Sequence, residues 1–214
     1  MLLVCPPATA DQYGPQAFAV SNGTTTLGDG TTIAGTDGTA SVQNGALRLT
    51  QAGTSSTFSS FRIPALSNSS GGWTATFDFL LADNPGGSNP ADGFSFSYGA
   101  IPAYNPNQST PSAPDAHGGG EEGWHPAIPH LSFEADTWDN GGGEDGFNIA
   151  ISGEDVAFEN QTVLSNGQSI SGSMELSWNP VNGASMRVDL GSGLAPVFTN
   201  RSEEHTSELQ SPVT

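Results

Sequence analysis

We predict an all-β fold, a two-sheet antiparallel β-sandwich, on three observations. The chain has 214 residues, a length that one large β sandwich commonly fills. Glycine supplies 28 residues and proline 15, and short runs rich in aromatic and β-branched residues recur between them, which is typical of strands joined by irregular loops. Apolar and polar residues alternate along these runs, so each strand has one apolar face that a second sheet must cover.

Strands are predicted where alternating windows are bounded by Gly, Asn, Pro or Asp. They cover residues 46–51, 57–63, 73–81, 93–99, 130–138, 147–152, 173–178 and 185–190. In residues 73–79 the apolar side chains occupy odd positions and the polar ones even positions, as a half-buried strand requires. The segment 179–183, Asn-Pro-Val-Asn-Gly, predicts a turn that joins the last two strands as a hairpin.

The charge balance narrows the classes of partner. Acidic residues number 22 against four Arg and no Lys, for a formal net charge of −18, which would repel the phosphates of nucleic acid. Neutral or cationic ligands and divalent cations are compatible with this charge, and solubility in salty surroundings is an alternative reason for it. No stretch approaches the roughly 18 apolar residues that span a bilayer, and the single Cys5 allows no disulfide framework. We expect neither nucleic-acid binding nor membrane insertion.

The two ends of the chain differ in character from the rest. Residues 1–5, Met-Leu-Leu-Val-Cys, followed by Ala8-Thr9-Ala10, fit the remnant of a signal peptide, with an arbitrary fragment end as the alternative. We therefore expect a secreted or cell-surface protein. Residues 201–214 resemble the translation of a sequencing adapter, which predicts a non-native tail rather than a short polar helix or linker. The predicted domain is 12–200, a sandwich that lacks its last strands.

The densest group of oxygen-bearing side chains follows the strand predicted at 130–138. Residues two apart on a strand share a face, so Glu134 and Asp136 point the same way before the glycines at 141–143. Calcium takes six to eight oxygen ligands. One Ca²⁺ could be held here by Asp136, Asn140, Asp145 and the carbonyl of Trp138, with Glu134 orienting a water on the ion. The alternative is a solvated acidic loop at a strand end.

This segment resembles the metal loop of L-type (legume-type) lectins in the concanavalin A-like lectin/glucanase superfamily, in which Glu-x-Asp runs into an aromatic, an Asn and a later Asp. Residues 91–96, Ala-Asp-Gly-Phe-Ser-Phe, are similar to the strand whose Asp reaches the sugar in that family, and residues 118–120 stand in place of its glycine loop. The likeness spans residues 45–190. It implies a concanavalin-like jelly roll and a carbohydrate-binding function.

The resemblance implies a shallow saccharide site that also makes chemical sense. Vicinal hydroxyls of a neutral sugar would meet the Asp92 carboxylate, the Asn140 amide and a backbone N–H of Gly119 or Gly120. Trp124 or Trp138 would cover the apolar face of the ring, with core or hairpin packing as the alternative role of Trp138.

The sequence also departs from that family. Asn148 stands where these lectins carry the His of a Mn²⁺ site, so Ca²⁺ alone is expected. The histidines of and beside the segment 102–129, His117, His125 and His130, are predicted to be loop or packing residues rather than ligands.

Two other functions remain open on the same scaffold. Retaining β-glucanases carry Glu-x-Asp-x-x-Glu, and residues 134–139 read Glu-Ala-Asp-Thr-Trp-Asp, so a glycoside hydrolase would use Glu134, Asp136 and Asp139. That mechanism needs two carboxyl groups about 5 to 5.5 Å apart. Asp139 is shorter than Glu and would face away from Glu134 unless the strand is bulged. The third possibility is a non-catalytic surface or matrix module, and we favour the carbohydrate binder over both.

Overall fold

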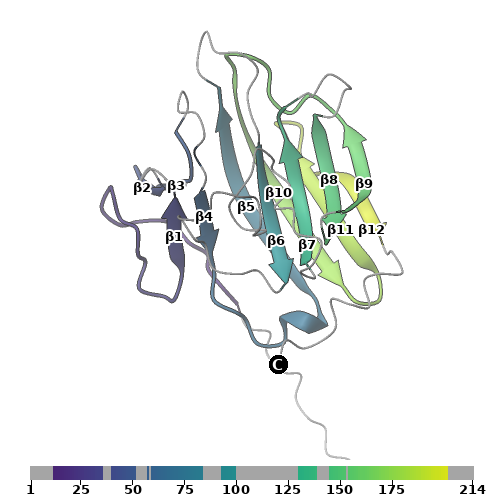
Figure 1. The fold of residues 1–214 in the computed structure, drawn as a ribbon, viewed down its shortest axis with the longest axis horizontal. Helices are drawn as coiled ribbons and strands as arrows, with labels where there is room; N and C mark the ends of the chain where they lie inside the picture. The colour runs from purple at the N-terminus through teal and green to yellow at the C-terminus, as the bar shows by residue number, and fades with distance from the viewer. Residues whose placement is uncertain are drawn as a thin grey trace, which may run out of the picture.

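The computed structural model describes residues 12–35, 40–51, 57, 59–83, 93–99, 130–138, 145–152 and 154–201. Within these ranges the protein is all-β, with two four-stranded antiparallel sheets and two small two-stranded sheets (Figure 1). The predicted all-β sandwich is therefore confirmed. None of the described residues form a helix that could cross a membrane.

The sandwich consists of two layers, which we name the front sheet and the back sheet from their order in Figure 1. The front sheet has the order β6-β7-β8-β9, with β6 Gly93–Gly99, β7 His130–Asp136, β8 Gly146–Ile151 and β9 Glu154–Asn160. The back sheet has the order β12-β11-β10-β5, with β5 Trp73–Ala82, β10 Ser169–Asn179, β11 Gly183–Asp189 and β12 Ala195–Arg201. All neighbouring strands in these two sheets are antiparallel.

The earlier part of the chain forms a separate group at one flank of the sandwich (Figure 1). In this group β1 Thr32–Gly35 pairs with β4 Ser59–Arg62, and β2 Ser41–Gln43 pairs with β3 Ala46–Arg48. Its small apolar cluster contains Ile33 and Val42, with Phe18 packed edge-on against Phe61 at 5.9 Å between ring centroids. A 3₁₀ turn, η1 Ser69–Gly71, precedes β5.

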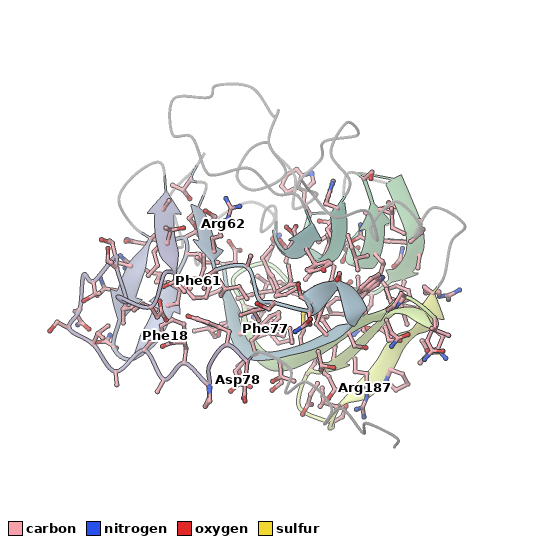
Figure 2. All side chains as sticks on the ribbon, turned by 90° about the horizontal axis from the view of Figure 1, so that it is seen from below. Phe18, Phe61, Arg62, Phe77, Asp78 and Arg187 are labelled. Carbon is pink, nitrogen blue, oxygen red and sulfur yellow. The ribbon has the colours of Figure 1, made fainter. Side chains whose placement is uncertain are left out.

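The core lies between the two sheets because the apolar positions of each strand face the opposite layer. Trp73 of β5 lies 5.4 Å from Phe96 of β6 and 5.9 Å from Phe133 of β7, measured between ring centroids. Phe77 is stacked on Phe96 at 6.2 Å, and Figure 2 shows it pointing between the layers. Aromatic pairs of this kind add about 0.5–1.5 kcal/mol each beyond the area that they bury. Fully buried Trp178 completes this layer.

The predicted hairpin turn at 179–183 is present, and the side chain of Asn179 holds it. The Oδ1 atom of Asn179 accepts the N–H of Val181 at 2.8 Å and the N–H of Asn182 at 3.2 Å. Asn179 and Gly183 form the last pair of the β10–β11 ladder. A side chain that satisfies the backbone of the next residues is what makes Asn a turn former.

Some strand boundaries differ from the prediction. β7 ends at Asp136, two residues early, because the Asp136 side chain accepts the N–H of Trp138 at 2.7 Å as the chain leaves the strand. β10 begins at Ser169 instead of residue 173, because its antiparallel pairing with β5 continues as far as the pair Ser169–Ala82. β12 extends to Arg201, and the rest of the predicted tail, 202–214, lies outside the described residues.

The unpredicted strands are β1, β2, β9 and β12, which are short, polar or irregular. β2 has three residues and joins β3 through Asn44 and Gly45, both at positive φ (52° and 78°). That Asn-Gly pair is the sequence pattern of a two-residue hairpin, and it would have indicated β2.

Candidate functional site

Three strand ends lie side by side at one end of the front sheet. Asp136 is the last residue of β7, and its register partners are Gly93, the first residue of β6, and Gly146, the first residue of β8. Asp145 directly precedes Gly146. The topology thus brings together the ends of three segments for which the sequence predicted metal or sugar contacts. We call this row, Gly93, Asp136 and Gly146, the strand-end row.

The two glycines of the strand-end row are there for a steric reason. A Cβ on Gly93 would lie 2.0 Å from the carbonyl oxygen of Ala135, and its φ of 130° is unsuited to other residues. A Cβ on Gly146 would lie 2.2 Å from the carbonyl oxygen of Glu159. Both neighbours of Asp136 are therefore positions where strands approach too closely for any side chain.

Asp136 is 7% exposed, and its carboxylate lies at the point where the chain leaves β7. Its Oδ1 atom accepts the N–H of Trp138, which fixes the first turn of the following loop. Trp138 and Asp145 are both half-buried. Three of the predicted calcium ligands are therefore at one end of the sheet, while the fourth, Asn140, lies outside the described residues.

Glu134 faces the same side of β7 as Asp136, as predicted, and it is fully buried. Its Oε1 atom accepts the hydroxyl of Ser132 at 2.5 Å, and its Oε2 atom accepts the side-chain amide of Asn148 at 2.5 Å. The same Asn148 nitrogen donates to Oδ1 of Asp155 at 2.9 Å. These contacts supply the hydrogen bonds that a buried carboxylate requires.

Polar residues of β7 and β8 extend this arrangement along the face of the front sheet that points away from the core. The buried members of this polar face are His130, Ser132, Glu134, Asp136 and Asn148. Their apolar neighbours in sequence, such as Leu131 and Phe133, belong to the core between the sheets. Both faces of β7 are thus buried, one apolar and one polar.

No protein-family model matches the chain. No curated protein matches it either. The functional assignment therefore depends on the chemistry of the strand-end row and of the polar face beside it.

Other predicted site residues lie in segments that the structure does not describe. These are Asp92, Gly119, Gly120, Trp124, Asp139 and Asn140, together with His117 and His125. Asp92 directly precedes Gly93, so the chain reaches it from the strand-end row. Among the described residues there is no group of three or more His, Cys, Asp or Glu side chains that could hold a metal ion.

The sequence prediction missed Ser132 and Asn148 as hydrogen-bond donors to Glu134, and Asp155 as the second acceptor of the Asn148 amide. Ser132 was open to inference, because it stands two residues before Glu134 and so shares its face. The contacts of Asn148 with Glu134 and Asp155 could not be predicted, because the β7–β8 register sets Glu134 opposite Asn148 and a bulge in the β8–β9 ladder sets the position of Asp155.

Proposed function

We propose that the protein is a carbohydrate-binding, lectin-like module whose shallow saccharide site is supported by one Ca²⁺. The observation that carries the proposal is the strand-end row, in which Asp136 lies between the strand starts that follow Asp92 and Asp145. A cation bound to Asp136 and Asp145 would neutralise two neighbouring carboxylates and would order the loops that leave these strands.

The donors available at the strand-end row suit a hard cation. Asp136 and Asp145 offer carboxylates, Trp138 offers a backbone carbonyl, and Asn140 would add an amide oxygen by the resemblance. Oxygen donors of this kind favour Ca²⁺ over transition metals. On β8 the family's His position is taken by Asn148, whose amide nitrogen is a hydrogen-bond donor to Glu134 and Asp155 and is no metal ligand. We therefore propose no Mn²⁺ site.

The saccharide would bind beside the cation. Asp92 would accept hydrogen bonds from two sugar hydroxyls, while the Asn140 amide and a backbone N–H of Gly119 or Gly120 would donate to sugar oxygens. The cation contributes by holding the loops in place, since binding to preformed loops avoids the cost of ordering them. This places the affinity for sugar under the control of the cation.

Burial of Glu134 favours a binding function over glycoside hydrolysis. A retaining hydrolase needs its nucleophile in contact with the sugar ring. Glu134 has no exposed surface, and both of its carboxylate oxygens accept hydrogen bonds from protein side chains. A substrate could reach Glu134 only after the polar face had opened.

The calcium site also fits the proposed location outside the cell. Calcium sites of extracellular modules bind with a Kd of about 10⁻⁴–10⁻³ M. Such a site fills in extracellular fluid rather than in a cytosol. We propose on this ground, together with the leader-like residues 1–10, that the protein is secreted or displayed at the cell surface.

Calorimetric titration with CaCl₂ tests the cation site. We expect one binding event that is lost in Asp136→Asn and kept in Glu175→Gln, which removes a carboxylate from the outer face of the back sheet. A glycan array run with and without chelator then tests the saccharide site. Glycan capture should vanish with chelator and in Asp136→Asn.

Two results would refute the proposal. Calcium binding that survives Asp136→Asn would remove the strand-end row from the metal site, and glycan capture that ignores chelator would separate the sugar from the cation. Release of reducing sugar from laminarin, agar or carrageenan, lost in Glu134→Gln, would establish the hydrolase instead.

A further inference from the structure

A small hollow lies on the back sheet, on the side of the sandwich opposite the polar face. Its volume is about 180 Å³, and its lining residues are Thr76, Phe77, Asp78, Ser173, Met174 and Leu194. Figure 2 shows Asp78 and Arg187 on the outer side of the back sheet, while Phe77 points to the core. The accessible surface of the hollow therefore comes from the outward-facing side chains of β5 and β10 and from Leu194.

The floor of the hollow is polar and ordered. Ser173 pairs with Asp78 in the β5–β10 ladder, and its hydroxyl donates to Oδ1 of Asp78 at 2.7 Å. Among the described residues Asp78 has no other hydrogen-bond partner, so its Oδ2 atom can accept from a ligand. Thr76, which is also exposed, adds a hydroxyl that can donate or accept.

One wall of the hollow is held by two independent anchors. Oδ1 of Asp189 accepts the N–H of Gly191 at 2.7 Å and that of Gly193 at 2.8 Å, which fixes the turn between β11 and β12. Arg187 donates to the carbonyl of Leu194 at 3.3 Å and is itself paired with Glu175 at 2.8 Å. The wall is thus preformed, which reduces the ordering cost of binding.

Leu194 supplies the apolar part of the hollow. Its side chain is 38% exposed at the end of this clamped turn. A carboxylate acceptor and a hydroxyl set opposite an exposed apolar group match a sugar ring, which carries hydroxyls at its edge and C–H groups on its face. The carboxylates of Asp78, Glu175 and Asp189 on this side of the sheet disfavour an anionic ligand.

We propose that this hollow is a second saccharide subsite, which takes one ring of a neutral sugar. The proposal rests on the carbohydrate-binding function proposed above. At about 180 Å³ the hollow is smaller than the roughly 300 Å³ at which drug-sized pockets begin, so it takes no more than a single ring. Asp78 and Thr76 bind adjacent hydroxyls, and Leu194 covers the C–H face. A long polysaccharide occupying this subsite and the strand-end site gains by avidity.

The test is an NMR titration of the ¹⁵N-labelled full chain with methyl glucoside, methyl galactoside and methyl mannoside, all with chelator present. Chelator disables the calcium-supported site, so the two sites are read separately. At least one sugar should move the amide signals of Thr76, Asp78, Ser173 and Leu194 in a saturable way. Asp78→Ala should weaken this binding at least tenfold.

Thr74→Ala is the matched control, because Thr74 lies on the same exposed face of β5 outside the hollow and its loss should leave binding unchanged. Asp78→Asn, which keeps the size of the side chain, guards against a folding defect and should also weaken binding. Absence of shifts with all three sugars, or shifts that persist in both Asp78 variants, overturns the proposal. Stronger shifts of the same amides by methylammonium chloride would make the hollow a cation site and also overturn it.

Discussion

β7 and β5 alternate apolar and polar residues in the same way, yet their polar side chains have opposite surroundings. On β5 the polar positions Thr74, Thr76 and Asp78 are exposed, whereas on β7 Ser132, Glu134 and Asp136 are buried. A side chain in water has its hydrogen bonds supplied by solvent, but a buried one must find partners in the protein. Alternation therefore reveals a strand, whereas the burial of its polar face decides whether each polar side chain needs a specific hydrogen-bond partner in the protein.

The same contrast appears between β8 and β10. Asn148 of β8, itself buried, donates to the buried carboxylate of Glu134 and to the carboxylate of the exposed Asp155. Glu175 of β10 makes an ion pair with Arg187 in which the two side chains are 32% and 43% exposed. We expect substitutions on the polar face of the front sheet to be costly and those on the outer face of the back sheet to be mild, and four measurements test this.

The largest effect is expected for Glu134→Ala. Removing the carboxylate leaves the hydroxyl of Ser132 and the amide of Asn148 buried without this acceptor, so the free energy of unfolding should fall by about 3 kcal/mol. Urea denaturation measures this, with Glu175→Ala as the matched loss of a carboxylate on the back sheet, expected below about 1 kcal/mol. Equal losses in the two variants would abolish the distinction between the faces.

A smaller effect is expected for Gly146→Ala. The new Cβ would meet the carbonyl oxygen of Glu159 at 2.2 Å, and separating β8 from β9 should cost about 2 kcal/mol. Gly167→Ala is the control, because its φ is +68° but no atom lies within 4 Å, and it should cost about 1 kcal/mol. If thermal unfolding ranks Gly167→Ala as the more harmful change, close strand approach is not what selects glycine at the strand-end row.

The ion pair between Glu175 and Arg187 should contribute little. A double-mutant cycle with Glu175→Ala and Arg187→Ala should give a coupling energy of about 0.5 kcal/mol, since both groups remain partly in water. The coupling should shrink further in 1 M salt, where the screening length is about 3 Å. A salt-independent coupling well above about 1 kcal/mol would show that polar contacts on this face stabilise the fold as strongly as those on the polar face of the front sheet.

The mildest effect should be a pH-dependent loosening of the turn after β11. Hydrogen bonds from the N–H groups of Gly191 and Gly193 lower the pKa of Asp189 from its ordinary value of 3.8. Because the folded pKa is depressed, the stabilisation is complete above pH 3.8 and is lost as pH falls through the lower folded value. The amide chemical shifts of Gly191 and Gly193 should report this titration, which Asp189→Asn should remove. Shifts that titrate equally in the variant would assign the effect to another group.

Most of the fold could be predicted because the strands of the sandwich have long apolar faces. In β5 the residue types alternate from Trp73 to Phe79, and in β10 from Ser173 to Asn179, long enough to distinguish a strand from a helix. β12 could not be predicted, because it contains Pro196, is bulged against β11 and lies at a sheet edge. β9 is strongly polar, and its ladder with β8 is also bulged.

Less of the candidate site could be predicted. The shared face of Glu134 and Asp136 follows from the strand period alone, and β7 has it. Neither the burial of Glu134 nor its contact with Asn148 follows from local sequence, because both depend on which strand pairs with β7 and in what register.

By itself, the sequence determined where apolar and polar residues alternate along strands, where the chain turns at Asn and Gly, and that an acidic segment follows one strand. These properties are local, since side-chain direction and turn geometry depend on a few neighbouring residues. The tertiary structure decided that Gly93, Asp136 and Gly146 share a row and that the polar face of β7 is buried. Register and burial are relations between segments far apart in the chain, and only packing of the two sheets sets them.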